Sequence, residues 1–461
     1  MKKNMYKFFT AIVLLGLSAI AANAQTWDIG LINPSDVKAT LSGNTLTITG
    51  TGPMNHFQTN FVNTSKAPWY DLRTTITSIV INDGVTSVGH HAFDGCSNLT
   101  FITLPNSLTD IGSYSFNQCT ALASIKLPNS VLSISSYAFN GCTGLTSITL
   151  PNLLNVISDC AFEGCSGLTS VTIPSSVALI GSSSFGSCSG LTTINFNATN
   201  CKVSSNESPF YSSAVTTINI GSDVLTIPDY FFYNMKAVKS VIIPGSVVSI
   251  GYYAFGGCSS LTSISLPNSL LMIGWYAFSY CSGLTSITIP SSVLSIGPSA
   301  FGGCSGLTSI TIPSSVMLIG SSAFSSCSAL TDVRVSWQTP LSVPSKIFAS
   351  VNTSSAVLHV HAGTKSLYVS DPVWGTFGTI VDDLFTGIPN IPAEAKAFVS
   401  GNVLYVDSPS AETVRVYSAN GVLLHSFRKQ GGKACYPVNL PASGILIVKG
   451  GSGWASKVMV E

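Results

Sequence analysis

The sequence predicts a repeat solenoid, a parallel β-solenoid of about twelve coils that is followed by a small all-β sandwich. Three observations predict it. Cysteines recur every 23 residues, an apolar strand pattern recurs in phase with them, and only 8% of the residues are charged. Soluble globular chains average about 25% charged residues, and helical surfaces usually need that charge. The composition therefore favours a β architecture.

The cysteine spacing reveals the repeat, because self-similarity at a fixed period is typical of solenoids. Two sets of cysteines are each spaced by 23 residues: Cys96, Cys119, Cys142, Cys165 and Cys188, and then Cys258, Cys281, Cys304 and Cys327. Ser212 and Met235 hold the same phase between the sets, after a one-residue insertion near Cys201. The array is therefore continuous along the sequence.

Each cysteine is followed by a pattern typical of a short strand, as in AFNGCTGLTSITLP. Leu145, Ile148 and Leu150 carry the pattern LxxIxI, in which alternate side chains point inward. Twelve such strands are predicted in register, from the one at 76–81 to the one at 330–335. Proline follows most of them, where its missing N–H ends the strand.

Two further columns of residues recur in each coil. A glycine column suggests a tight turn with unusual backbone angles; it comprises Gly112, Gly181, Gly251, Gly274, Gly297 and Gly320. A phenylalanine column should fill the convex half of the core; it comprises Phe93, Phe116, Phe139, Phe162, Phe185, Phe232, Phe255, Phe278, Phe301 and Phe324.

The segment LTSITIPSSVLSIGPSAFGGCSGL resembles the BspA-like class of bacterial leucine-rich repeats. The resemblance covers a predicted solenoid at 76–335. APWYD at 67–71 is similar to the N-terminal cap of that family, and the segments WQTPLSVPSKIF and HVHAGTKSLYVSDPVWGTFGTIV are similar to its C-terminal cap. We therefore expect caps at 25–75 and 336–385. The resemblance implies adhesion to host extracellular-matrix proteins or to other bacteria.

Both ends of the chain indicate export. Residues 1–24 have a basic start, an apolar run at 8–22 and a small-residue cleavage site, as signal peptides do. No later apolar run is long enough to predict a membrane span. After a predicted linker at 386–396, four short runs and the turn signal at 418–421 predict an antiparallel module at 397–461. VRVYSANGVLL, GILIVKG and KVMVE resemble a type IX secretion sorting domain, which implies a location outside the cell or on its outer surface.

No common catalytic or nucleotide-binding motif occurs in the sequence, so no enzyme activity and no cofactor is predicted. The net charge of +1 and the lack of a basic cluster outside the signal peptide exclude nucleic acid as a partner. His359 and His361 share one face of a strand and could be two metal ligands, but no third ligand is evident. An ordinary exposed strand is the favoured interpretation, and no metal site is predicted.

The column cysteines are predicted to be small buried hydrophobes, because parallel side chains do not converge as a disulfide requires. Cys160, Cys201 and Cys435 lie outside the column and are expected to be reactive or partly exposed. On the concave face, Ser147 and Thr149 and their equivalents form a hydroxyl array. Such an array could match a periodic ligand such as ice or a polysaccharide, but threonine is also simply a good strand former.

Aromatic residues gather just after the glycine column in three consecutive coils. The candidate ligand contacts are Tyr230, Tyr252, Tyr253, Trp275, Tyr276 and Tyr280. An exposed aromatic patch marks a binding site, whereas rings that lie flat would only cover the convex backbone. The function predicted is binding of a host or bacterial surface protein. The alternatives are a glycan-binding module for nutrient capture and a structural surface-layer component. No oligomeric state is predicted.

Overall fold

The computed structural model describes residues 24–58, 66–384, 396–400, 403–408, 410–418, 421–430, 432–437, 444–451, 453 and 455–460. The predicted signal peptide, apart from Ala24, and the predicted linker, apart from Lys396, lie outside these residues, as do two residues of the turn signal at 418–421. The chain divides into two compact units, residues 1–218 and 219–461, which are described in turn.

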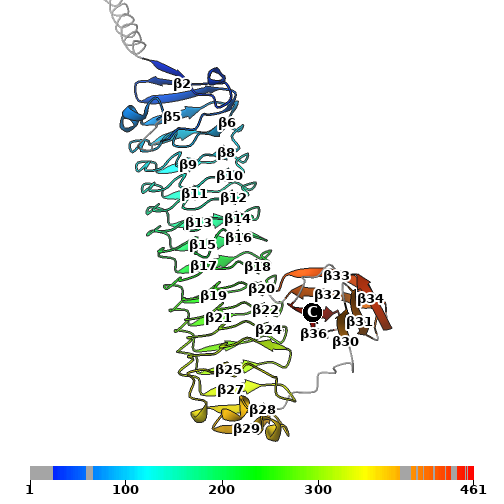
Figure 1. Ribbon diagram of the computed structural model, residues 1–461. Helices are drawn as coiled ribbons and strands as arrows, with labels where there is room; N and C mark the ends of the chain where they lie inside the picture. Colours follow the sequence, from blue (N-terminus) through cyan, green and yellow to red (C-terminus); the bar gives the residue numbers. More distant parts are fainter. Residues whose placement is uncertain are drawn as a thin grey trace, which may run out of the picture. The chain divides into compact units, whose positions relative to one another are not determined.

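Unit 1 begins with the antiparallel strands β1 (Gln25–Asp28), β2 (Val37–Ser42) and β3 (Thr45–Gly50). β3 then pairs in parallel with β5 (Ser78–Ile81), so the N-terminal strands join the sheet of the coils directly. The strands that follow are stacked one per coil (Figure 1): β7 (Phe101–Thr103), β9 (Ser124–Lys126), β11 (Ser147–Thr149), β13 (Ser170–Ile173), β15 (Thr193–Phe196) and β17 (Thr217–Ile220). Short 3-10 helices lie at Pro34–Asp36 and Tyr70–Thr75.

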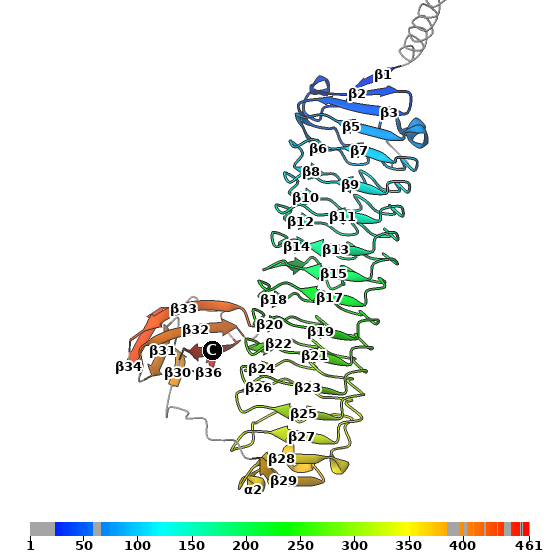
Figure 2. The ribbon, with the colours of Figure 1, turned by 180° about the vertical axis from the view of Figure 1, so that it is seen from behind.

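A second set of short strands runs along the opposite side of the same coils (Figure 2). It consists of β4 (Gly52–Pro53), β6 (Val85–Val88), β8 (Asp110–Ile111), β10 (Ser133–Ile134), β12 (Val156–Ile157), β14 (Leu179–Ile180) and β16 (Lys202–Val203). These strands pair in parallel with a register of one repeat, as Ile134 does with Ile157. The strand pattern of the sequence did not include this set, because two residues are too short a run to show a period.

Unit 2 continues the same plan with β19 (Ser240–Ile242), β21 (Ser263–Ser265), β23 (Ser286–Thr288), β25 (Ser309–Ile312) and β27 (Asp332–Val335). The second set comprises β18 (Thr226–Ile227), β20 (Ser249–Ile250), β22 (Met272–Ile273), β24 (Ser295–Ile296) and β26 (Leu318–Ile319). The predicted parallel β-solenoid is therefore confirmed. It has about 13 coils, because the predicted C-terminal cap contributes β28 (Val357–His361), which pairs in parallel with β27 but lies outside the 23-residue period. A 3-10 helix at Thr353–Ser355 precedes β28. α2 (Lys365–Val369) and a 3-10 helix at Trp374–Thr376 lie between β28 and β29 (Thr379–Leu384) in the sequence.

The predicted antiparallel C-terminal module is also confirmed, and it contains more strands than the four runs indicated. One sheet comprises β30 (Lys396–Ser400), β31 (Val403–Ser408) and β34 (Gly432–Pro437). The other comprises β32 (Glu412–Ser418), β33 (Leu423–Lys429), β35 (Gly444–Gly450) and β36 (Ala455–Val460). Leu404 and Val406 of the first sheet share a buried core with Val414, Val416 and Leu446 of the second.

The phenylalanine column forms the predicted core stack. In unit 1, the rings of Phe116, Phe139 and Phe162 are buried and lie parallel, with centroids 5.1 Å apart at each step. In unit 2, Phe278 and Phe301 stack at 5.4 Å. Burial of apolar surface is the main stabilising contribution in a chain with so few charges.

Tryptophans close both ends of this core. Trp69, in the predicted N-terminal cap, stacks on Phe93 at 6.0 Å and donates its indole N–H to the carbonyl of Ala92. At the other end, Trp374 lies against Phe348 at 5.6 Å. Each indole covers apolar surface that another coil would otherwise cover, which is the task of a terminal repeat in a solenoid.

The column cysteines are buried and free, as predicted. The structure adds a reason for cysteine at this place, because every column thiol except that of Cys96 lies within hydrogen-bonding distance of the phenylalanine carbonyl of the coil before it. Cys142 donates to Phe116 at 3.1 Å and Cys304 donates to Phe278 at 3.1 Å. A small side chain with a weak donor therefore fills the core and also satisfies a buried carbonyl.

Serine and threonine connect successive coils where another fold would use charged side chains. The Ser176 hydroxyl donates to the carbonyl of Leu154 at 2.7 Å, and Ser292 donates to Leu270 at the same distance. Thr146 donates in the same way to Ala123. Each of these hydroxyls donates to a backbone carbonyl of the neighbouring coil. These carbonyls are therefore hydrogen-bonded although the chain has few charged side chains.

The interpretation of the glycine column was wrong. None of the six glycines has a positive φ: Gly112, Gly181, Gly251, Gly274, Gly297 and Gly320. Close packing between coils explains them instead, since a Cβ added to Gly274 would lie 2.6 Å from the carbonyl oxygen of Ile250 and 2.7 Å from the carbonyl carbon of Gly251. The left-handed backbone occurs two residues later, at Tyr253 and Tyr276.

The Phe stack should dominate local stability. We expect Phe139→Ala to lower the free energy of unfolding by about 3–5 kcal/mol, because it leaves a ring-sized cavity between two neighbouring rings. Tyr137→Ser in the same coil is the control, since this half-buried outer position should cost no more than about 1 kcal/mol. Urea unfolding measures both variants. Equal losses would contradict the core assignment.

The buried thiols should resist alkylation. Burial raises the pKa of the Cys258 thiol to about 12 and that of Cys281 well above its ordinary value. At pH 8.5 an unperturbed thiol is about half ionised, so iodoacetamide should leave the nine column cysteines unmodified in the folded protein and label them in denaturant without reductant. Mass spectrometry counts the labels. Recovery of most of them as disulfides would contradict the prediction.

Candidate binding surface

The six aromatic candidates lie in consecutive coils of unit 2, and five of them form one network of ring contacts. Tyr230, Tyr253 and Tyr276 form a ladder. The centroids of the first pair are 5.3 Å apart, and those of the second pair are 4.6 Å apart with planes inclined by only 4°. These three rings are half-buried. Each ring is therefore partly covered by its surroundings and partly accessible.

The remaining candidates extend the ladder. Tyr252 packs edge-on against Tyr253 at 4.7 Å and reaches Trp275 at 6.4 Å. Trp275 is 58% exposed and Tyr280 is 67% exposed. Tyr280 lies over Gly303 of the next coil, where an added Cβ would come within 2.7 Å of the ring. These exposed rings make the surface available to a partner.

Tyr233 belongs to the same cluster, although the sequence analysis missed it. Its ring packs edge-on against Tyr230 at 5.8 Å and against Tyr253 at 5.4 Å. Tyr233 lies between the phenylalanine column and the cysteine column, at a position that has no recurring aromatic residue in the sequence. No column signal could therefore have found it. We call these seven residues the aromatic cluster: Tyr230, Tyr233, Tyr252, Tyr253, Trp275, Tyr276 and Tyr280.

Four tyrosines of the aromatic cluster have a left-handed backbone, with φ of 57° at Tyr230, 50° at Tyr253, 53° at Tyr276 and 57° at Tyr280. For a residue with a Cβ this conformation costs about 1–2 kcal/mol. At the position of Tyr280 the adjacent coils have Gly257 and Gly303, also with positive φ. The fold therefore accepts glycine there, and the ring is not needed for the backbone.

A similar ladder occurs in unit 1. His91, Tyr114 and Tyr137 stack with centroids 4.6 Å apart, and the column then continues with the smaller residue Cys160. Ring stacking in this column is thus a general property of the array. The aromatic cluster of unit 2 differs because edge-on rings and exposed rings surround its ladder, which enlarges the apolar surface at one place.

Two hydroxyls of the ladder are held in the neutral form. Burial raises the pKa of Tyr253, and the neighbouring tyrosines raise it further. Burial also raises the pKa of Tyr230, which receives an additional upward contribution from its hydrogen bond with Tyr252. A neutral phenol on an apolar support can donate and accept hydrogen bonds while its ring area is buried, as hot-spot residues do.

The other predicted residues do not assemble into a site. His359 approaches Asp383 at 2.9 Å and Asp332 at 3.5 Å, whereas His361 faces the carbonyl of Ala362. Among the described side chains, no group of three or more His, Cys, Asp or Glu residues is placed to hold a metal ion.

The three cysteines outside the column differ from one another. Cys160 is partly exposed, as expected. The expectation for Cys201 was wrong, because this residue is 4% exposed and burial raises the pKa of its thiol to about 12. The side chain of Cys435 lies outside the described residues.

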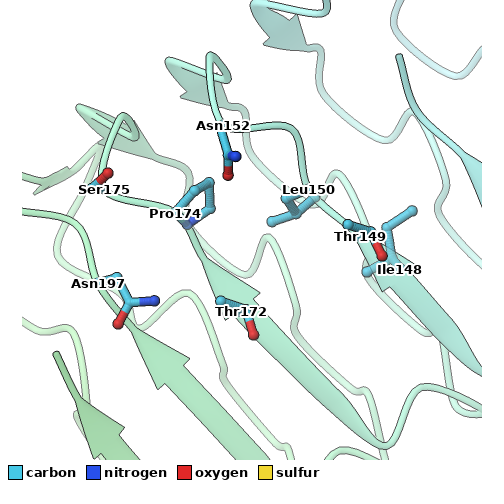
Figure 3. A pocket seen from close by; sticks show the side chains of 8 residues that line it. All are labelled: Ile148, Thr149, Leu150, Asn152, Thr172, Pro174, Ser175 and Asn197. Carbon is cyan, nitrogen blue, oxygen red and sulfur yellow. The ribbon is translucent and has the colours of Figure 1, made fainter. Parts of the chain in front are cut away.

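The hydroxyl array is confirmed on the face of the long strands, where Ser147 and Thr149 are exposed. At its edge in unit 1 lies a shallow pocket of about 380 Å³ (Figure 3). It is lined by Ile148, Thr149, Leu150, Asn152, Thr172, Pro174, Ser175 and Asn197. The preceding coils have proline at the position of Asn197, so its amide side chain departs from the repeat pattern.

The repeat identifies the family. The BspA-type leucine-rich repeat region, in six copies, matches residues 69–192, 110–239 and 225–354. The chain belongs to the BspA-type leucine-rich-repeat family. No curated protein matches this BspA-type chain. Within the part of the chain that the structure describes, no helix has the length and apolar character of a membrane span.

Solved structures similar to this BspA-type chain include a leucine-rich repeat protein from Bacteroides ovatus. It has 25% sequence identity and a TM-score of 0.29, with 65% of this chain and 93% of that chain covered. Another is a leucine-rich cell surface protein from Faecalibacterium prausnitzii. It has 25% identity and a TM-score of 0.33, with 68% of this chain and 95% of that chain covered.

The ring of Tyr280 should be dispensable for folding of the BspA-type array. We expect Tyr280→Gly to leave the free energy of unfolding unchanged or to raise it by up to about 1 kcal/mol, because glycine removes the left-handed strain. The reverse change, Gly303→Tyr at the equivalent position of the next coil, should lower it. Thermal unfolding compares the two. A clear loss for Tyr280→Gly would show that the ring belongs to the core.

Proposed function

We propose that this protein is a surface-displayed binding protein, an adhesin for a host extracellular-matrix protein or for a protein on other bacteria. Family membership supports a binding role, since solenoids offer extended surfaces for partners. The signal peptide and the sorting-domain resemblance of the C-terminal module support export and display on the cell surface. The aromatic cluster is the proposed contact surface.

The observation that carries the proposal is the presence of exposed or half-exposed rings at positions where other coils have no ring. Both coils that flank Tyr280 have glycine at its position. Tyr253 and Tyr276 share their column with Ser299 and Ser322, which have the same backbone conformation without a ring. The repeat therefore does not require these rings, and an exposed aromatic patch that packing does not require supports a contact surface.

A glycan is the second candidate ligand, and the exposure of Trp275 favours it. An indole that is 58% exposed offers a flat apolar face beside Tyr252 and its phenol hydroxyl. Ligand sites combine such apolar surface with a few polar groups that fix orientation. In this alternative the protein is a glycan-binding module of a nutrient-capture system.

Loss of the protruding rings should abolish binding and spare the fold. The variant is Tyr252→Ser, Trp275→Ser and Tyr280→Gly, in which each new residue occurs at the same position of another coil. A buried aromatic anchor contributes about 2 kcal/mol or more to binding, so we expect binding to weaken by well over tenfold. Pull-down against matrix proteins and bacterial surface fractions, followed by titration and a glycan array, provides the measurement.

The matched control changes the ladder of unit 1 instead, as Tyr114→Ser and Tyr137→Ser. These substitutions remove half-buried rings of the equivalent ladder outside the aromatic cluster, so they should not affect the partner's affinity. Circular dichroism checks that both variants fold. If the cluster variant binds normally, or if the control loses binding equally, the aromatic cluster is a coat over the backbone and not the contact surface.

A further inference from the structure

Three apolar residues on the outer side of unit 2 are buried, although leucines at the same positions of other coils are exposed. Leu271 and Leu294 are 5% and 4% exposed. Leu132 and Leu225 occupy the same column, immediately before the short strand, and are 46% and 43% exposed. The coil alone therefore does not bury a leucine at this position, and another part of the chain must cover it.

The next column shows the same contrast. Met272, the first residue of β22, is 3% exposed, whereas Leu179 at the equivalent position of β14 is 36% exposed. Ser249 and Ser295 of the flanking coils are buried, while Ser133 in this column is half-buried. The covered area thus extends over β20, β22 and β24. We call Leu271, Met272 and Leu294 the outer patch.

The residues that cover the outer patch come from the C-terminal module. Tyr417 of β32 and Ile447 of β35 form one buried cluster with the outer patch, and Ala455 of β36 packs against it. Tyr417 and Ile447 are paired across the two strands. They are distinct from the residues of β32 and β35 that form the core between the two sheets, such as Val416 and Leu446.

A glycine in the hairpin between β32 and β33 provides a second observation. Gly421 has φ of 82°, and a Cβ added to it would lie 2.9 Å from the Sδ of Met272 and 3.2 Å from the Oγ of Ser249. Backbone of the module therefore lies in close contact with two coil side chains, and a larger residue at this position would require the side chain of Met272 to shift. The positive φ of Gly421 independently favours glycine in the hairpin.

We propose that the outer patch is a docking site for the chain's own C-terminal module, which covers it with Tyr417 and Ile447. The contact is apolar on both sides, so the module is held against the coils by burial of surface and not only by the covalent connection. The inference is independent of the proposed function. It also places the module beside the aromatic cluster, because Trp275 follows Met272 by three residues, a span of at most about 10 Å.

The test uses the mature chain, residues 25–461, with Leu271→Asn, Met272→Ser and Leu294→Asn. These residues occur in the same columns of other coils, as at Asn155 and Ser133, so the array tolerates them. Small-angle scattering should show a shift to a larger maximum dimension as the module undocks. The matched control is Leu132→Asn, Leu179→Ser and Leu225→Asn, which changes the same columns where they are exposed and should leave the scattering unchanged.

A second variant on the other side of the contact, Ile447→Lys, leaves every coil intact and should produce the same shift. If the patch variant and Ile447→Lys both scatter like the unchanged protein, the docking site is refuted. A wild-type chain that is already fully extended would also refute it. A concentration-dependent dimer that both variants dissolve would assign the patch to the module of a second copy and overturn the intramolecular contact.

Discussion

The register of one coil on the next is the constraint on which the rest of this structure depends. Within each unit, every coil must match its neighbour in ring stacking and backbone hydrogen bonding, and most coils also match in the position of a buried thiol. Phe139 shows all three: its ring stacks on both neighbouring rings, its N–H donates to Ala161, and its carbonyl accepts from the thiol of Cys165. A repeat of fixed length keeps these contacts in phase. Where a coil is longer, as between Phe185 and Phe210, the ring stack is retained with centroids 5.5 Å apart.

This constraint divides the residues of a coil into two classes. Inward positions admit few side chains, because each fills a defined space between two identical neighbours. Outer positions admit many, as the sequence from Tyr137 through Cys160 to Ser183 in one column shows, with a left-handed backbone at each. Binding surfaces can therefore change on the outer side without disturbing the core. The aromatic cluster and the outer patch both use this freedom.

The unusual composition follows from the same arrangement. In a stack of parallel coils the acceptors between coils are mainly backbone carbonyls, and a hydroxyl such as that of Ser176 reaches them without a charge. Among the described residues the ion pairs are few, and several of them gather where the regular array ends, around Asp332 and His359.

The sequence by itself determined whatever recurs with the period: the solenoid, the long strands, the Phe stack and the buried cysteines. A period reports which positions share an environment. It does not report why a residue type is needed there. The glycine column was therefore interpreted as a requirement for unusual backbone angles, whereas the close approach of the adjacent coil explains it. Contacts that occur once were decided only by the tertiary structure. Tyr233 packs in the aromatic cluster, Cys201 is buried, and Tyr417 contacts Leu271. No spacing in the sequence records these features, because none of them recurs from coil to coil.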